Sequence, residues 1–151
     1  AKPGSYLGLQ TIFGDRINHY SATTITDVNA CFIDIGVFKD LIQSNSSFAY
    51  ELIVFICQEE LVYYKRFVDQ FQKQLNGRLA DALIFLAEEI FQSSEFVLPF
   101  TKYDMAALVG STRESVTRAI KSFKETGIIQ LKEKRIKIID MAKLKNISKT
   151  G

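Results

Sequence analysis

The sequence contains few of the residues that build disulfide scaffolds, zinc sites and haem sites. Its 151 residues include two cysteines and one histidine. Cys31 and Cys57 are far apart and have no Cys or His beside them, so the sequence predicts neither a disulfide scaffold nor a zinc site, and we interpret them as two isolated buried thiols. His19 has no second ligand nearby, which favours a surface or loop position over haem binding. We therefore expect no metal and no cofactor.

Signatures of membrane proteins and of enzymes are also missing. No apolar run reaches the roughly 18 residues that a membrane helix needs, and no signal peptide precedes the first motif, so we expect a cytoplasmic protein without a membrane contact. The sequence shows no nucleophile paired with a base and no paired carboxylates. The segment GSYLG, residues 4–8, lacks the lysine of a phosphate-binding loop. We expect no enzymatic activity and no catalytic residue.

The composition is that of an ordinary globular protein, with an uneven charge distribution. With 47% hydrophobic and 24% charged residues, the chain is long enough for one large or two small domains. Residues 101–151 hold twelve basic and five acidic residues, whereas residues 1–100 hold seven basic and twelve acidic ones, and the two surpluses combine to the net charge of +2. This distribution is the one expected if only the C-terminal part contacts nucleic acid.

Residues 101–124, TKYDMAALVGSTRESVTRAIKSFK, predict two helices that meet at Gly110. Glycine at this position can adopt the left-handed conformation that ends a helix. Ser111 followed by Glu114 has the spacing of a capping box for the second helix, and Thr112 is a competing cap residue. The apolar faces consist of Met105, Leu108 and Val109 in the first helix and Val116, Ala119, Ile120 and Phe123 in the second. This pattern predicts a helix-turn-helix.

The opposite side of the second helix carries polar and charged residues. Arginine matches the acceptor edge of guanine and a carboxylate can accept a hydrogen bond from cytosine, so this set suits base edges in a DNA major groove. Arg113 and Arg118 would read guanines and Glu114 a cytosine, while Lys121 and Lys124 would lie nearer phosphates. The alternative is a charged helix face that is simply solvated.

A predicted β-hairpin follows the second helix and argues against the solvated-face alternative. Residues 128–140, IIQLKEKRIKIID, form two short alternating apolar runs around Lys132, Glu133 and Lys134. The order of helix, recognition helix and hairpin with a basic tip predicts a winged helix-turn-helix.

The N-terminal segment has the pattern of an incomplete β-domain. It has glycines at 4, 8 and 14 and then two strand-like runs, residues 20–26 and 30–35, with turn residues between them. So few strands cannot cover the apolar side chains of this segment, and we expect further strands to precede it. A short amphipathic helix is predicted at residues 37–42.

A long helix is predicted next, because residues 48–75 contain no glycine or proline and Asn45, Ser46 and Ser47 can cap its start. Its apolar residues lie on more than one side, which indicates a β-domain on one side and a second copy of the helix on the other. The alternative is a helix buried entirely within one subunit. The expected dimer interface consists of Leu52, Phe55, Ile56, Val62 and Phe67.

Asn76 and Gly77 predict a hinge after the long helix. The apolar face of the next helix, which would pack under the helix-turn-helix, comprises Leu79, Leu83, Leu86, Ala87 and Ile90. Residues 140–147 predict a last short helix, and we expect residues 148–151 to fray.

With these elements in place, the chain resembles the Crp/Fnr family of bacterial transcription regulators, relatives of the cyclic-AMP receptor protein. The most specific part is residues 101–129, in which a glycine precedes an Arg-Glu pair and an arginine follows four residues after the Glu. Residues 76–90 are similar to the helix after the family's hinge, and residues 4–35 to the last third of its cyclic-nucleotide-binding β-roll. The resemblance implies an α+β fold with a remnant of the effector-sensing β-roll at 1–44, a dimerisation helix at 45–75 and a winged helix-turn-helix DNA-binding domain at 76–151.

The resemblance implies a homodimer that binds double-stranded DNA at a palindromic, TGTGA-like site, with RNA polymerase as a further partner. The base-reading positions carried over by matching are Arg113, Glu114, Thr117 and Arg118. The positions expected near phosphates are Thr101, Ser111, Thr112, Lys121, Lys124 and Lys134. A second interpretation is a protein-interaction module whose winged helix has lost DNA binding, but the intact Arg113, Glu114 and Arg118 set and the basic C-terminal part argue against it.

The sensor end departs from the nucleotide-binding pattern of the family. Leu9 follows Gly8 where nucleotide-binding members carry a glutamate, and Tyr20 precedes Ser21 and Ala22 where they carry an arginine. Tyr63 and Tyr64 stand where smaller hydroxyl residues would meet the base. Because the charge-assisted contact to the phosphate is lost, we expect that cyclic AMP does not bind. The effector is unknown.

Overall fold

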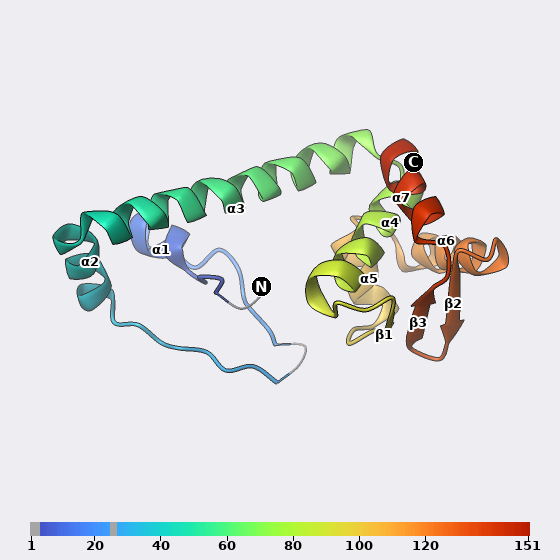
Figure 1. The fold of residues 1–151 in the computed structure, drawn as a ribbon, viewed down its shortest axis with the longest axis horizontal. Coiled ribbons are helices and arrows are strands. Elements are labelled where there is room, and N and C mark those ends of the chain that lie inside the picture. The colour runs from blue at the N-terminus through green and yellow to red at the C-terminus, as the bar shows by residue number, and fades with distance from the viewer. Residues whose placement is uncertain (1–3, 25–26) are drawn as a thin grey trace. The chain divides into compact units, whose positions relative to one another are not determined.

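The computed structural model describes residues 4–24 and 27–151. The chain divides into two compact units, Ala1–Tyr63 and Tyr64–Gly151. Figure 1 labels helices α1 to α7 and strands β1 to β3. Within the described ranges, none of the helices is both long and apolar enough to span a membrane.

The first unit consists of α1 (Leu9–Phe13), α2 (Ile35–Ser44) and the first part of α3 (Ser46–Gln72). Asp34 caps α2 by accepting hydrogen bonds from the backbone N–H groups of Gly36 and Val37, at 2.8 and 3.1 Å. Asn45 caps α3 in the same way through the N–H of Phe48, at 3.0 Å. The cap at Asn45 confirms the predicted start of the long helix, whereas α2 extends beyond the predicted residues 37–42 at both ends.

A small apolar cluster holds the first unit together. Leu9, Phe38 and Leu52 are buried, with Ile42, Phe48 and Phe55 packed against them. The ring of Phe38 meets that of Phe48 edge to face at 5.8 Å between centroids. Helices α1, α2 and α3 thus each contribute one buried side chain to this cluster.

The two strands predicted at residues 20–26 and 30–35 are not formed in the described residues of these ranges. Residues 20–24 and 30–34 contain no strand, Ile35 begins α2, and residues 25–26 lie outside the described part of the chain. A strand requires a neighbouring strand to pair its backbone N–H and C=O groups, and none of the described residues of this unit supplies one. Cys31 and Cys57 are exposed, so the interpretation as buried thiols was wrong.

The end of α3 differs from the predicted hinge at Asn76 and Gly77. The helix ends at Gln72, the break falls at residues 73 and 74, and α4 (Leu75–Phe85) already includes Gly77 in its first turn. A Cβ atom added to Gly77 would lie 2.5 Å from the carbonyl oxygen of Gly151. This glycine therefore permits a close approach of two backbones and does not interrupt the helix.

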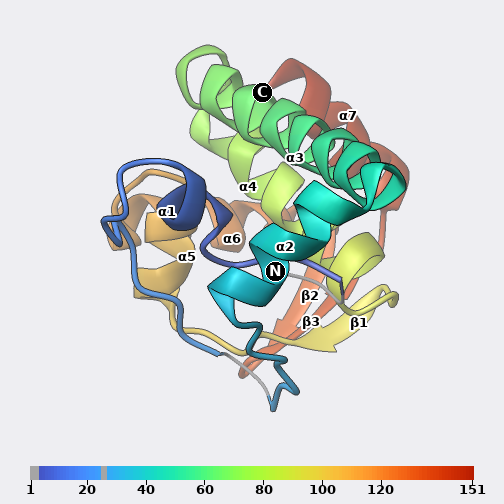
Figure 2. The ribbon, with the colours of Figure 1, turned by 90° about the vertical axis from the view of Figure 1, so that its left-hand side faces the viewer.

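The second unit is built on a three-stranded antiparallel sheet in the order β1-β3-β2. Its strands are β1 (Glu95–Val97), β2 (Ile129–Lys132) and β3 (Arg135–Ile138), and the last two form the predicted hairpin. The helical elements are α4, the π-helix η1 (Leu86–Ile90), α5 (Lys102–Leu108), α6 (Arg113–Glu125) and α7 (Met141–Thr150). Helices α4 and α7 lie side by side (Figure 2). This arrangement is the predicted α+β fold with a winged helix-turn-helix.

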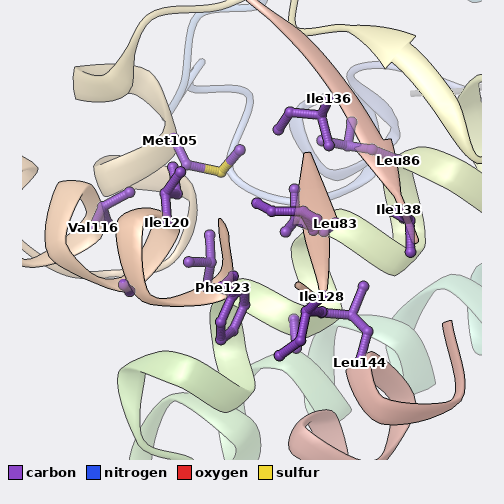
Figure 3. Packing of buried hydrophobic residues seen from close by; sticks show 14 of the residues in the cluster. Leu83, Leu86, Met105, Val116, Ile120, Phe123, Ile128, Ile136, Ile138 and Leu144 are labelled. Carbon is purple, nitrogen blue, oxygen red and sulfur yellow. The ribbon is translucent and has the colours of Figure 1, made fainter. Parts of the chain in front are cut away.

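One continuous core joins these helices to the sheet (Figure 3). The buried side chains from α4 and η1 include Leu79, Leu83, Leu86 and Ala87, as predicted. Ile136 of β3 pairs in register with Phe96 of β1 on one side and Leu131 of β2 on the other. The recognition-helix candidate, α6, is anchored to this core by Val116, Ala119, Ile120 and Phe123.

Two details of this unit differ from the expectations. Leu108 is 48% exposed, whereas Met105, Ala106 and Val109 are buried. At about 100° per residue, the side of α5 that carries these three leaves Leu108 at its edge. Residues 148–150 are helical and not frayed, because the hydroxyl of Ser148 donates a hydrogen bond to Asp81 of α4.

Candidate nucleic-acid interface

Helix α6 presents two distinct faces. Val116, Ala119, Ile120 and Phe123 are each at most 6% exposed. Arg113, Glu114, Arg118, Lys121 and Lys124 are exposed, and Thr117 is partly exposed. The apolar anchors therefore fix the rotation of the helix about its axis, and the side chains predicted to read bases point away from the core.

The start of α6 is fixed by Thr112 and not by Ser111. The hydroxyl of Thr112 accepts a hydrogen bond from the backbone N–H of Ser115 at 3.2 Å, and Arg113 is the first helical residue. The predicted Ser111–Glu114 capping box is therefore wrong by one residue. Glu114 is instead free to pair with Arg113 on the surface.

The turn before α6 contains the predicted left-handed glycine. Gly110 has φ +60°, and the N–H of the next residue, Ser111, donates to the carbonyl of Ala106 at 2.9 Å. This closure satisfies a carbonyl at the end of α5 that the helix itself leaves unpaired. The glycine thus lets the chain reverse direction within a few residues of Arg113.

Thr101 and Asp104 form a capping box at the start of α5. The Asp104 carboxylate accepts from the backbone N–H of Thr101 at 2.8 Å and from its hydroxyl at 2.7 Å. Hydrogen bonds from the side chain and then the backbone of Thr101 hold the pKa of Asp104 below its ordinary value. The hydroxyl of Thr101, expected near a DNA phosphate, is engaged within the protein in this structure.

Five polar side chains stand together on the first two turns of α6. The Arg113 guanidinium lies 3.3 Å from the Glu114 carboxylate, and Nη2 of Arg118 donates to the hydroxyl of Ser115 at 3.3 Å. The hydroxyl of Thr117 donates to the carbonyl of Arg113 at 2.8 Å, which leaves its lone pairs to accept. Both guanidinium groups keep further N–H donors directed at solvent.

Glu114 is held in its ionised form. A hydrogen bond from its own backbone N–H lowers the pKa of the carboxyl, and the charges of Arg113 and Arg118 lower it further. At neutral pH the side chain is therefore an acceptor only. The carboxylate acceptor of Glu114 and the guanidinium donors of Arg113 and Arg118 therefore alternate on this surface.

The residues expected near phosphates are distributed along the same unit. Lys121 lies 3.7 Å from Glu125 one turn further along α6, and Lys124 is exposed in the last turn. Lys134 lies in the turn between β2 and β3 and is exposed, next to Glu133 with φ +55°. Ser111 is partly buried, and the Thr112 hydroxyl is engaged as the cap of α6. Their phosphate contacts stay predictions.

Two open hollows adjoin the start of α6, and both include residues that the sequence reasoning missed. One, of about 460 Å³, is lined by residues of α5 and of the turn, among them the exposed Tyr103. The other, of about 450 Å³, is lined by Lys102, Arg113, Glu114 and Thr117. The sequence did contain an indication of Lys102 and Tyr103, because the predicted helix-turn-helix begins at residue 101. In such a motif the first turn of the first helix lies beside the N-terminus of the second.

Comparisons with known proteins agree with this geometry. Residues 77–147 match the family described as the Crp-like helix-turn-helix domain. The whole chain is 31% identical to the transcriptional regulator SdrP of Thermus thermophilus, in an alignment that covers 99% of this chain and 71% of that protein. It is therefore a member of the Crp/Fnr family of transcription regulators, as the sequence resemblance indicated.

Two further similarities were found, one in sequence and one in fold. The chain is 27% identical to the CRP-like cAMP-activated global transcriptional regulator of Mycobacterium tuberculosis, over 94% of this chain and 65% of that protein. FixK2 from Bradyrhizobium japonicum shares the fold, with a TM-score of 0.71 and 18% identity over 76% of this chain and 59% of that one. The chain thus spans about two thirds of the length of the curated relatives it matches.

Proposed function

We propose that this protein is a sequence-specific DNA-binding regulator that acts as a homodimer on a palindromic site. The observation that carries the proposal is α6, whose apolar face is buried while Arg113, Glu114, Thr117 and Arg118 face outward at its N-terminal end. In a helix-turn-helix, this end of the second helix meets base edges in the major groove.

The chemistry of these four residues suits a TGTGA-like half-site. The guanidinium forks of Arg113 and Arg118 each match the O6 and N7 acceptors of a guanine, and the Glu114 carboxylate can accept from the N4 amino group of a cytosine. Thr117, whose hydroxyl donates to the carbonyl of Arg113, can accept one further hydrogen bond. Lys121, Lys124 and Lys134 supply positive charge toward phosphates, which adds affinity without sequence preference.

A dimer would place two such helices about one turn of DNA apart. Helix α3 supports this proposal because Ile56, Val62 and Phe67 are 40%, 47% and 62% exposed in the single chain. Phe55 is partly buried in the first unit, and Leu52 is 6% exposed because its own chain covers it. We therefore assign the self-association surface to Ile56, Val62 and Phe67.

We further propose that the effector is not cyclic AMP. The backbone N–H of Gly8 donates to the hydroxyl of Tyr20 at 3.1 Å, and Leu9 is buried. A cyclic nucleotide would need a carboxylate for its ribose hydroxyl and a cation for its phosphate, and these two positions are occupied by an apolar side chain and a phenol. Titration calorimetry with the intact protein tests this proposal, since micromolar affinity for cyclic AMP would contradict it.

RNA polymerase is the partner through which a regulator bound to DNA would act, and no enzymatic activity is part of the proposal. The DNA-binding proposal is tested by fluorescence anisotropy with a palindromic TGTGA duplex and a scrambled duplex of equal length, across a salt series. Arg118→Ala should weaken binding to the palindrome by about 1–3 kcal/mol and binding to the scramble little.

Two other outcomes have distinct meanings. Equal and steeply salt-dependent binding to both duplexes would reduce the interaction to phosphate attraction and contradict the proposed half-site. No binding at low salt would contradict DNA recognition altogether and favour a protein-interaction role for the winged helix.

A further inference from the structure

Arg78, in the first turn of α4, donates hydrogen bonds to four backbone carbonyls. Its Nε donates to Val109 at 2.8 Å and its Nη2 to Gly110 at 3.3 Å. Its Nη1 donates to Gln70 at 3.4 Å and to Lys73 at 2.5 Å. The side chain is partly buried, so these contacts use a guanidinium that has lost much of its access to water.

The four carbonyls belong to the C-terminal ends of two different helices. Gln70 lies in the last turn of α3 and Lys73 directly follows that helix, while Val109 and Gly110 directly follow α5. Carbonyls at a helix C-terminus have no partner within the helix and carry the negative end of its dipole. One cation therefore caps α3 and α5 together, and Figure 1 shows α4 starting just after the end of α3.

Arginine is suited to this position by its shape. Its planar group carries five N–H donors at fixed angles, so different nitrogens can serve two helix ends at once. A lysine would keep the positive charge on a single nitrogen. Among the contacts of Arg78 in the described part of the chain, none is to a carboxylate, and its hydrogen-bond partners there are carbonyls at the two helix ends.

A second contact joins the same two segments. The side chain of Gln70, in the last turn of α3, packs so closely on Gly110 that a Cβ atom added to this glycine would collide with it. Gly110 lies only two residues before Thr112, the cap of α6, and three before Arg113. The end of α3 is thus in contact with the turn that sets where α6 begins.

We propose that Arg78 is a positioning residue for DNA recognition, which holds the turn of the helix-turn-helix against the end of α3 and so fixes the direction in which α6 presents its base-reading side chains. This inference rests on the proposed function. Arg78 itself bonds to backbone carbonyls and does not belong to the exposed face of α6, so its effect on DNA would be indirect.

The test compares Arg78→Gln and Arg78→Lys with the wild-type protein and with Arg66→Gln. Arg66 is a matched control because this arginine of α3 stacks its guanidinium over the ring of Phe85 in α4 at 5.0 Å. Within the described part of the chain it makes no hydrogen bond to the turn. Amide hydrogen exchange is measured without DNA over residues 66–74 and 105–113. Anisotropy with the palindromic TGTGA duplex is measured across a salt series.

For Arg78→Gln we expect faster exchange in both segments and DNA affinity at least about fivefold weaker, with an unchanged salt slope. Arg78→Lys should fall between it and the wild type, and Arg66→Gln should match the wild type. If Arg78→Gln does not fold, hydrogen exchange and DNA affinity of Arg78→Lys test the proposal in its place.

Unchanged exchange at residues 105–113, or an affinity within about twofold of the wild type, would overturn the proposal. A salt slope reduced by about one would also overturn it, because it would show that Arg78 touches a phosphate directly. A wild-type protein without preference for the palindrome would contradict the proposed function, and the exchange data alone would then decide whether Arg78 holds the turn.

Discussion

The guanidinium of Arg113 lies 3.3 Å from the carboxylate of Glu114, so the first two residues of α6 pair with one another on the protein surface. Both side chains are about two thirds exposed, at 65% and 68%. An ion pair this accessible to water contributes little to stability. Its residues are therefore available to exchange their mutual contact for contacts with DNA bases.

This relationship predicts that Glu114→Gln separates specificity from stability. The amide cannot match the ionised carboxylate as an acceptor for a cytosine amino group, so discrimination at that base pair should relax. The melting temperature should not change. Anisotropy with duplexes that carry each of the four base pairs at this position measures the first effect, and thermal unfolding the second. Unaltered discrimination would remove Glu114 from the base-reading set.

The cap of α6 provides a second prediction with a matched control one residue away. Thr112→Ala should lower the free energy of unfolding by about 0.5–2 kcal/mol, because the N–H of Ser115 loses its acceptor at the helix start. Ser111→Ala should change it by less than about 0.5 kcal/mol. Urea unfolding of both variants measures the difference. A larger loss of stability in Ser111→Ala than in Thr112→Ala would instead support the Ser111–Glu114 capping box.

The winged helix-turn-helix could be predicted from the sequence because its signals are local. The buried Val116, Ala119, Ile120 and Phe123 repeat at helical spacing, Gly110 marks the turn, and the alternating run after residue 127 forms the hairpin. Each of these patterns depends on residues within a few positions of one another. The recognition face followed directly as the side opposite the apolar stripe.

The features that sequence reasoning missed depend on contacts between distant segments. Arg78 contacts carbonyls 31 and 32 residues away, and no periodicity indicates that contact. Gly77 was interpreted as a hinge, although its role is to admit the backbone of Gly151. The strand-like runs at residues 20–26 and 30–35 had the right composition, but a strand also needs a partner to pair with. Local pattern therefore predicted the elements of the winged helix-turn-helix well, and contacts between distant segments poorly.

Helix α3 offers a third prediction, which contrasts a covered residue with an exposed one. Leu52 packs with Leu9 and Phe38, so Leu52→Ala should destabilise the protein by about 2–5 kcal/mol through the cavity it leaves. Ile56→Glu should leave the fold intact and weaken self-association, because a charge would be buried between two copies. Analytical ultracentrifugation and thermal unfolding distinguish the effects. Dimers of undiminished affinity in Ile56→Glu would exclude this surface as the interface.

The capping box of α5 gives a prediction for pH. Hydrogen bonds from Thr101 lower the pKa of Asp104 below its ordinary value of 3.8, so the folded state favours the ionised carboxylate. The resulting stability is present above pH 3.8 and is lost as the pH falls through the lowered pKa of the folded state. Asp104→Asn keeps the shape but carries no charge at any pH. The wild type should therefore be the more stable protein at neutral pH, and the difference should shrink as the solution becomes acidic.

Urea unfolding of wild type and Asp104→Asn at matched pH values measures this difference directly, because the other carboxyl groups titrate alike in both proteins. Asp140→Asn is the control on α7, where the aspartate accepts a hydrogen bond from the N–H of Lys143 at 2.8 Å. A difference between wild type and Asp104→Asn that stays constant from neutral pH to below pH 3.8 would show that the Thr101 contacts act through the shape of the side chain and not through its charge. A difference that grows in acid would contradict the lowered pKa, since the sign of the linkage would then be reversed.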